Sequence, residues 1–301
     1  MSTVTTSDGI ELAVQTAGDP TRSTVVLVHG FPDDHSAWDG IVQRLVVDHH
    51  VVTYDTRGTG VSDKPNRIVD YRLDQLADDL QRVIDHAIEQ AGTDEGVHLV
   101  GHDWGSVQAW HLITGHDLHG VLSYSSISGP CIDHVPGWVA RKAKQRRFRD
   151  IVAMWKSPLY MGFFSIPVVA PILARLGLID PTIRLAINAF ERPDSDSPRP
   201  PGPSARRNAA SIRIYAANVL PRLAKPERDG TDVPVLVLTP QRDIFIPSVT
   251  QRDPHPAIST IEIRDILGGH WAPTYNPGAV GDAIVEWVAR HSIVVPADDG
   301  P

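Results

Sequence analysis

The stretch VGHDWGS (residues 100–106) decides how this chain folds, because it joins a buried strand to a helix through a sharp turn. Its frame Gly101-x-Asp103-x-Gly105 has the spacing of a nucleophile elbow, a turn that exposes its middle side chain at one edge of a parallel sheet. That middle residue is usually a serine, whereas here it is an aspartate. The sequence therefore raises the question of which reaction uses a carboxylate at this position.

Short β-branched runs alternate with helical segments on both sides of this turn. Residues 23–30, 50–58 and 96–103 have the composition of buried parallel strands. A segment with Leu and Ile at helical spacing, residues 72–91, separates the second run from the third. This alternation predicts an α/β fold with a mostly parallel sheet that helices cover on both faces.

The alternation stops near Gly129 and resumes near VPVLVLTP (233–240). The residues between are mainly helical in character and include a Pro-rich loop at 192–204. We interpret this block as a helical cap inserted into the core. We predict a core made of residues 1–129 and 231–292. Residues 130–230 form the cap, and residues 293–301 form a disordered tail or linker.

Composition limits the partners and the compartment. The chain has 28 Lys and Arg against 36 Asp and Glu, a net charge of −8, which argues against a nucleic-acid partner. Cys131 is the single cysteine, so an intrachain disulfide is excluded and a reducing compartment is indicated. The N-terminal stretch has no signal-peptide pattern. We therefore expect a cytoplasmic protein.

One uncharged stretch, residues 157–174, follows a basic run at 141–150. Pro158, Pro167 and Pro171 interrupt it, which argues against a transmembrane helix. We interpret it as two short buried helices. Membrane association through shallow contact of the cap with a bilayer surface stays open as an alternative, because basic residues beside apolar ones favour such contact.

An aspartate at the elbow can displace a leaving group from a saturated carbon, which forms an ester that water then hydrolyses. His270, in a Gly-rich loop after the last strand, is the candidate base for this water. Asp243, just past another predicted strand, is the candidate orienting acid, with a loop-capping role as the alternative. The backbone N–H groups of Phe31 and Trp104 form a candidate oxyanion hole. His102 should pack behind the nucleophile.

Five motifs in this order and spacing resemble the α/β-hydrolase-fold epoxide hydrolases over nearly the whole chain: HGFPD (29–33), YDTRGTGVSDKP (54–65), GHDWGS (101–106), RDIFIP (242–247) and GGHW (268–271). The resemblance implies an eight-stranded sheet with an inserted helical cap. It also implies hydrolysis of a small lipophilic epoxide by water to a vicinal diol, through an ester on Asp103 and without a metal or organic cofactor. Haloalkane dehalogenases share these motifs.

In epoxide hydrolases of this fold, two cap tyrosines hydrogen-bond the epoxide oxygen and donate a proton as the ring opens. YMGFFSIP (160–167) resembles the first tyrosine motif and RIYAANV (213–219) the second, which assigns these roles to Tyr160 and Tyr215. Ser165 replaces a usual glutamine. Each tyrosine has a role in the amphipathic core as its alternative. Four apolar cap residues are expected to line the substrate pocket: Phe163, Phe164, Ile166 and Val168.

Two other functions stay open. A haloalkane dehalogenase would need a second halide donor beside Trp104, where Phe31 replaces a common asparagine. A non-catalytic ligand sensor would typically have lost part of the triad of nucleophile, acid and histidine, whereas here Asp103, Asp243 and His270 are all present.

SISGPCIDHV (126–135) and YMGFFSIPVVAPIL (160–173) also resemble the N-terminal half of actinobacterial proteins that fuse an epoxide hydrolase to a short-chain dehydrogenase. This implies that a C-terminal dehydrogenase domain is missing from the chain. The chain has no Gly-x-x-x-Gly-x-Gly loop, so we expect no NAD site.

Other conspicuous residues have structural interpretations. Asp55 and Arg57 should build a loop after a strand. Three tryptophans with apolar neighbours at helical spacing should lie in the core: Trp38, Trp110 and Trp287. The histidine groups lack an acidic ligand pattern, so we expect no metal at them: His49 and His50, and His111, His116 and His119.

Overall fold

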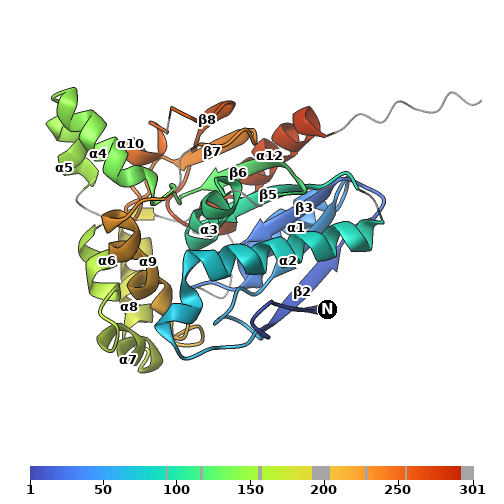
Figure 1. Ribbon diagram of the computed structural model, residues 1–301, viewed down its shortest axis with the longest axis horizontal. Coiled ribbons are helices and arrows are strands. Elements are labelled where there is room, and N and C mark those ends of the chain that lie inside the picture. Colours follow the sequence, from blue (N-terminus) through green and yellow to red (C-terminus); the bar gives the residue numbers. More distant parts are fainter. Residues whose placement is uncertain are drawn as a thin grey trace, which may run out of the picture.

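The computed structural model describes residues 1–92, 94–115, 118–154, 158–191, 204–227, 230–254 and 256–292. Its centre is an eight-stranded sheet with the order β1-β2-β4-β3-β5-β6-β7-β8 (Figure 1). The strands are β1 (Ser2–Thr5), β2 (Glu11–Ala17), β3 (Thr24–Val28), β4 (His50–Tyr54), β5 (Val97–His102), β6 (Val121–Ile127), β7 (Val235–Pro240) and β8 (Ile261–Ile266). The β1–β2 and β2–β4 pairs are antiparallel and the others are parallel. The predicted α/β fold is confirmed.

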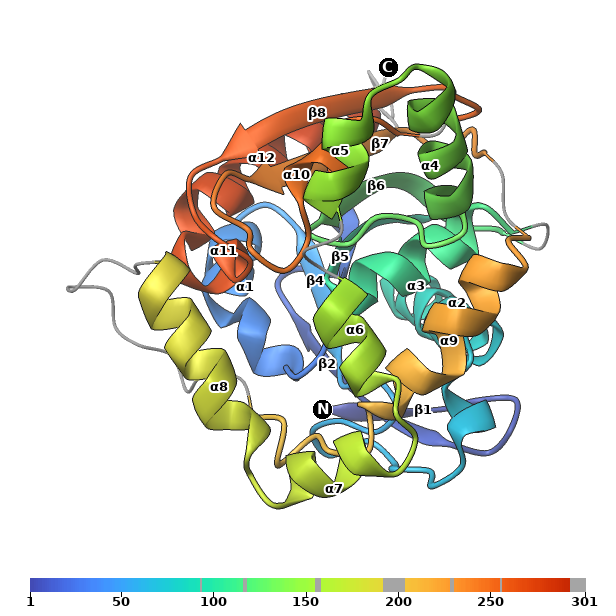
Figure 2. The same cartoon turned by 90° about the vertical axis from the view of Figure 1, so that its left-hand side faces the viewer.

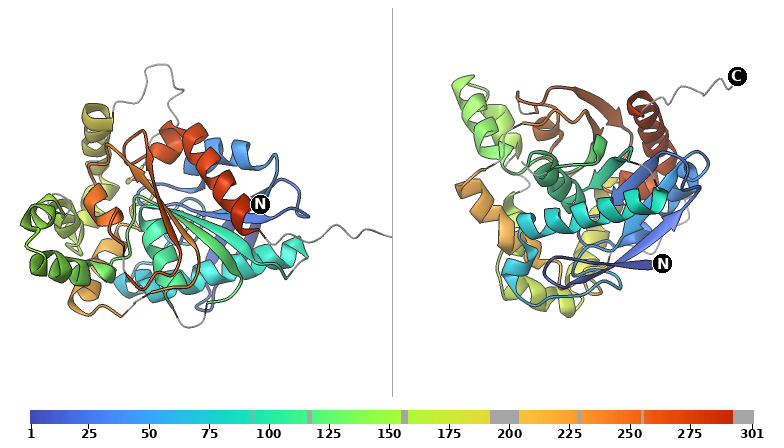
Figure 3. Two further views of the ribbon diagram at one scale, coloured as in Figure 1. Left: turned by 90° about the horizontal axis from the view of Figure 1, so that it is seen from above. Right: turned by 45° about the vertical axis from the view of Figure 1, so that its right-hand side comes forward.

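Alternating strand residues give the sheet two apolar faces. Val26 and Val28 of β3 face a cluster with α2 (Leu73–Ala91) and α3 (Trp104–Ile113). Val25 and Leu27 face the opposite cluster, with α1 (Asp39–Leu45) and α12 (Pro277–His291). Figure 3 shows α2 and α12 on opposite sides of the sheet. The tryptophans that the sequence predicts in the core are buried: Trp38, Trp110 and Trp287.

The elements described between β6 and β7 are all helical, and they lie over the carboxyl ends of the parallel strands (Figures 1 and 2). They are α4 (His134–Lys144), α5 (Phe148–Met154), α6 (Pro158–Phe164), α7 (Val169–Arg175), α8 (Ile179–Ala186), the helical turn Ile187–Glu191, and α9 (Arg213–Ala224). We call this group of helices the cap. Residues 192–203 of the Pro-rich loop and the tail 293–301 lie outside the described residues.

Short helices also follow the strands of the core: 3-10 turns at His35–Trp38 and Ile68–Tyr71, and helices α10 (Ser248–Gln251) and α11 (Ala272–Tyr275). No helix within the described ranges has the length and apolar character needed to cross a membrane.

The uncharged stretch forms two short helices, α6 and α7, but its burial is incomplete. In α7 only Ala170, Pro171 and Ala174 are buried, and they pack on the rest of the molecule. Val169 and Ile172 of the same stretch are exposed. The prediction of two buried helices is therefore wrong in this respect, because a helix on the surface of the cap buries only one face.

Two buried asparagines, one shortly before α9 and one within it, fix the cap to the core. The Asn208 amide group donates to the carbonyls of Pro32 (2.8 Å) and Asp33 (2.7 Å). The Asn218 side-chain oxygen accepts from the backbone N–H of Leu73 at 2.8 Å. Because both amides are buried, these bonds replace contacts with water and set the position of the cap.

The elbow occurs where the sequence predicts it. Asp103 joins β5 to α3 with φ 52° and ψ −124°, and its backbone N–H donates to the carbonyl of Ile127 at 3.0 Å. A Cβ at Gly105 would lie 2.1 Å from the Val28 carbonyl oxygen. A Cβ at Gly101 would lie 2.6 Å from Ser106 Cα. The two glycines therefore let α3 approach the sheet closely enough to form the turn.

Replacing Gly105 by alanine should destabilise the protein by about 3 kcal/mol or more, because the added Cβ collides with backbone that has no alternative rotamer. Gly137→Ala is the matched control, since Gly137 lies in α4 with open space around its Cα. This change should stabilise the helix by about 0.5–1 kcal/mol. Denaturant unfolding followed by circular dichroism measures both. Equal stability of the two variants would contradict this account of the elbow.

Candidate active site

The carboxylate of Asp103 is buried at the junction of β5, α3 and the loop after β3. The backbone N–H of Phe31 donates to Asp103 Oδ2 at 2.9 Å. A Cβ at Gly30 would lie 2.5 Å from Asp103 Oδ2 and 2.6 Å from the backbone N of Trp104, so these atoms crowd around a position that only glycine fits. The two N–H groups predicted as an oxyanion hole therefore lie beside this carboxylate.

His270 lies between two carboxylates. Its Nε2 is 3.4 Å from Asp103 Oδ1, and its Nδ1 lies 3.2 and 3.1 Å from the two oxygens of Asp243. Asp243 Oδ1 also accepts from the backbone N–H groups of Phe245 and Ile246, both at 2.9 Å, which holds this carboxylate in place. The structure thus brings the three predicted triad residues together from the ends of β5, β7 and β8.

The charges around His270 control its pKa. Burial of the ring would lower the pKa, but the negative charges of Asp243 and Asp103 outweigh it and raise the pKa of His270 well above its ordinary value. An imidazolium between two carboxylates is the form that this arrangement stabilises. Loss of the charge on Asp103 would therefore lower the pKa of the histidine.

His102 packs behind Asp103, as the sequence predicts. Its Nε2 lies 2.8 Å from the His270 carbonyl, which can only accept, so Nε2 carries the proton. Burial lowers the pKa of His102 to about 4, and the ring is neutral. The ring of Trp271 packs against that of His270, with centroids 4.8 Å apart. His102 and Trp271 therefore support the loop that carries the histidine.

Asp33 is a residue of this site that the sequence analysis missed. Trp271 Nε1 donates to Asp33 Oδ2 at 3.0 Å, and the carboxyl group is buried. Burial raises the pKa of Asp33 to about 7, and the charge of Asp103 adds to this shift. Asp33 lies two residues after Phe31 in the stretch HGFPDD. This closeness to a predicted site residue is the one feature of the sequence that could have indicated its place in the site.

Tyr160 of α6 and Tyr215 of α9 lie across a cavity of about 380 Å³ from the core residues, and Asp103 and His270 also line this cavity. Their ring centroids are 6.3 Å apart. Burial raises the pKa of both tyrosines well above the ordinary value, and the charge of Asp103 raises it further, so both hydroxyls keep their protons. The Trp104 ring packs edge-on against the Tyr215 ring, with centroids 4.9 Å apart.

The replacement residue Ser165 joins the two tyrosine-bearing helices. Its hydroxyl lies 2.7 Å from the carbonyl of Met161 in α6 and 3.3 Å from the carbonyl of Tyr215 in α9. Because a single hydroxyl proton serves both carbonyls, the contact is shared between them. Ser165 therefore contacts the backbone of the second tyrosine.

Most of the cavity lining is apolar, and the pocket prediction holds for two of its four residues. Phe163 and Phe164 line the cavity. Ile166 and Val168 do not border it, and 42% and 66% of their surfaces are exposed. These two residues follow the end of α6, and their exposed side chains lie on the surface of the cap. Their assignment to the pocket is wrong.

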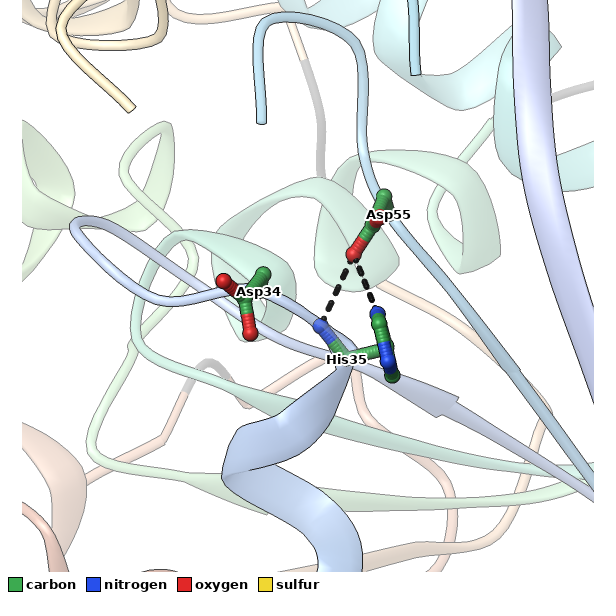
Figure 4. A group of neighbouring side chains, drawn as sticks. All are labelled: Asp34, His35 and Asp55. Carbon is green, nitrogen blue, oxygen red and sulfur yellow. Dashed lines mark hydrogen bonds and ion pairs between the residues drawn. The ribbon is translucent and has the colours of Figure 1, made fainter. Parts of the chain in front are cut away.

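Asp34, His35 and Asp55 form the cluster of potential metal ligands in the described part of the chain (Figure 4). Their oxygens already have partners. Asp55 Oδ1 accepts from the His35 backbone N–H at 3.0 Å and pairs with His35 Nδ1 at 2.7 Å. Its Oδ2 accepts from the Val61 N–H, and Arg207 pairs with Asp34. We therefore interpret the cluster as an ion-pair network between two loops.

The histidines for which no metal was expected hold other contacts. His111 pairs with Asp74 at 2.8 Å, and His119 pairs with Asp85 at 2.9 Å. His50 Nδ1 contacts the Thr24 hydroxyl. His116 lies outside the described residues.

This fold and this site define a class of protein. The family described as alpha/beta hydrolase fold matches residues 23–277, and the chain belongs to this family. Its relatives include epoxide hydrolases: Epoxide hydrolase A of Mycobacterium tuberculosis is 36% identical over 127 residues, covering 42% of this chain and 38% of that protein.

Over most of its length, the chain is similar to a Probable oxidoreductase EphD of Mycobacterium tuberculosis, with 33% identity over 290 residues. The match covers 93% of this chain and 48% of that protein, so the chain spans about half the length of such relatives.

Solved structures support the fold. A Bacillus megaterium epoxide hydrolase in complex with an inhibitor has a TM-score of 0.74 at 18% identity, covering 96% of this chain and 100% of the other. A Vigna radiata epoxide hydrolase mutant has a TM-score of 0.72 at 20% identity, covering 96% and 98%. The fold is that of epoxide hydrolase structures.

Replacing Asp243 by asparagine should lower the pKa of His270, because the charge that opposes the effect of burial is removed. NMR titration of the ring Cε1–H signals measures this value. Asp253→Asn is the control, since Asp253 pairs with Lys142 and lies outside the triad. An unchanged histidine pKa in the Asp243 variant would show that this carboxylate does not set it.

Proposed function

We propose that this chain hydrolyses a lipophilic epoxide to a vicinal diol through a covalent ester on Asp103. The observation that carries the proposal is the geometry of the cavity. A carboxylate at the elbow faces two protonated tyrosines across an apolar space, and His270 lies beside that carboxylate. The names of several relatives, among them Epoxide hydrolase A, support the same activity.

The first step is the attack of Asp103 on an epoxide carbon. The Phe31 N–H binds Oδ2, so Oδ1 is the oxygen that attacks. The carbon–oxygen bond of the ring breaks, and its electron pair stays on the departing oxygen. Tyr160 and Tyr215 hydrogen-bond this oxygen, and one of them transfers a proton to it. The result is a hydroxyalkyl ester on Asp103 and a tyrosinate, which solvent reprotonates.

The second step is hydrolysis of this ester. Esterification removes the negative charge of Asp103, so the pKa of His270 falls, the ring releases its proton to solvent, and the neutral imidazole can act as a base. It takes a proton from water as the water oxygen attacks the ester carbonyl. The negative charge develops on Oδ2 beside the N–H groups of Phe31 and Trp104. The intermediate then collapses, and the diol leaves with the proton from His270.

The same geometry argues against a haloalkane dehalogenase. That reaction stabilises a leaving halide with indole or amide N–H groups. Here Trp104 supplies one indole N–H, and the side chain at Phe31, where a second donor would be needed, carries none. The two tyrosine hydroxyls at the cavity, by contrast, can both bind and protonate a departing oxygen.

The name of the longer relative adds a proposal about domain organisation. The chain matches about half of a protein named as a probable oxidoreductase. Since the sequence contains no Gly-x-x-x-Gly-x-Gly loop, we assign the hydrolase chemistry to this segment and any dehydrogenase chemistry to the unmatched part of such relatives.

His270→Gln should trap the ester, because attack by Asp103 remains possible while its hydrolysis is blocked. Intact-mass spectrometry after exposure to aryl and long-chain alkyl epoxides should show an added mass equal to one whole epoxide. The double variant Asp103→Asn/His270→Gln is the control and should show none. An alkyl adduct from a haloalkane, without any epoxide adduct, would assign the dehalogenase reaction instead. No adduct from either class would leave the sensor as the function to test.

Tyr160→Phe and Tyr215→Phe should each slow ester formation by about tenfold to a hundredfold, and the double variant by more, because the departing oxygen loses a proton donor. Ester hydrolysis should change little. Rapid-quench single-turnover measurements separate the two steps. Tyr71→Phe is the control, since the Tyr71 hydroxyl donates to the Pro65 carbonyl outside the cavity. Equal slowing by the control would contradict a chemical role for the cap tyrosines.

A further inference from the structure

We propose that the outer face of the cap is a docking surface for an anionic lipid bilayer. The first observation is a group of large apolar side chains on and between α6, α7 and α8, each between 42% and 70% exposed. We call this group the apolar face. It consists of Phe163, Ile166, Val168, Val169, Ile172, Leu176, Leu178 and Leu185. Exposed apolar residues gathered in this way mark an interaction surface.

The arrangement of the helices places this face outward. Figure 2 shows α6, α7 and α8 on the side of the molecule that faces away from the sheet, with α4 and α5 beside them. Phe148 and Val152 of α5 are also largely exposed, so the apolar character continues onto that helix. Because the helices are short, together they present a broad surface rather than a single groove.

The charge of the segment is complementary to an anionic surface. Residues 134–191 contain nine Lys and Arg against three Asp and Glu, a net charge of +6. The whole chain carries −8, so the residues outside this segment carry −14. Five exposed cations form no ion pair with any carboxylate in the described part of the chain: Lys144, Arg146, Arg149, Arg175 and Arg184.

This charge distribution favours an anionic bilayer, rather than a second copy of the chain, as the partner of the apolar face. Two copies of the chain would bring two positive cap faces together, which opposes self-association through this face. An anionic bilayer attracts the cap and repels the acidic remainder, which orients the cap toward the lipid. Basic residues beside an apolar helical surface are the combination that binds the headgroup region of a membrane.

The cavity reaches the surface within the apolar face. Phe163 and Leu178 line the cavity, and they are also 43% and 57% exposed. A docked cap would therefore place the wall of the cavity against the acyl region of the bilayer. On the proposed function, a lipophilic epoxide dissolved in the membrane would then reach Asp103 along apolar side chains. This route rests on that function, whereas docking itself does not.

Co-sedimentation of the full chain with vesicles tests the docking. The probes are vesicles of phosphatidylcholine alone and of phosphatidylcholine with about one third phosphatidylglycerol. The chain should sediment with the anionic vesicles, less so at high salt, and should stay in solution with the neutral ones. Ile172→Glu/Leu176→Glu and Arg146→Glu/Arg149→Glu should each reduce the bound fraction about tenfold or more.

Val47→Glu is the matched control, since Val47 is 72% exposed but lies between α1 and the start of β4, at the amino ends of the parallel strands and away from the cap. It should bind vesicles like the unchanged chain. All of these variants should keep their turnover of a short water-soluble epoxide, because none of the replaced residues lines the cavity. If the unchanged chain binds anionic vesicles but hydrolyses no epoxide, the proposed function is overturned and the docking proposal stands.

Two results would overturn the docking proposal. One is the absence of binding to anionic vesicles, or equal loss of binding in the Val47 control. The other is a dimer in sedimentation velocity that Ile172→Glu/Leu176→Glu dissociates, together with no vesicle binding, which would assign the apolar face to self-association.

Discussion

The rest of the site depends on the backbone conformation of Asp103, with φ 52° and ψ −124°. A non-glycine residue in such a conformation costs about 1–3 kcal/mol, so the surrounding structure must hold it. The close approach at Gly101 and Gly105 does so, because α3 then begins directly against the sheet. The consequence is a carboxylate at the start of a helix, within reach of the Phe31 N–H. Without this turn, the loops after β7 and β8 would have no carboxylate to face.

The position of Asp103 also couples the two halves of the proposed reaction. The same carboxylate that attacks the epoxide holds the pKa of His270 high before the attack. Esterification neutralises it, and the histidine becomes a base only once there is an ester to hydrolyse. Asp243 takes no part in this change, and its contact with Nδ1 at 3.1 Å holds the ring in place on the other side. One charge therefore controls the order of the steps.

The sequence predicted the parts of this site that local spacing determines. The elbow, the strand ends and the order of Asp103, Asp243 and His270 follow from patterns a few residues long. The bond between Asp33 and Trp271 joins residues 238 positions apart, and no local pattern indicates it. The sequence also does not indicate which side of each cap helix faces the cavity. Prolines divide the cap into helices that are too short for their apolar spacing to define an inner face. The apolar character of Ile166 therefore predicts a place in the pocket, although the residue lies outside the cavity.

The cap and the core contribute opposite properties to the cavity. The core supplies the ionisable groups, and the cap supplies apolar walls and two hydroxyls that stay protonated. In such surroundings the charge of Asp103 is weakly screened, so it acts strongly both on His270 and on the tyrosines. That weak screening depends on the cap staying in place, which the buried amides of Asn208 and Asn218 provide. The ionisable groups of the core therefore depend on Asn208 and Asn218, which do not line the cavity themselves.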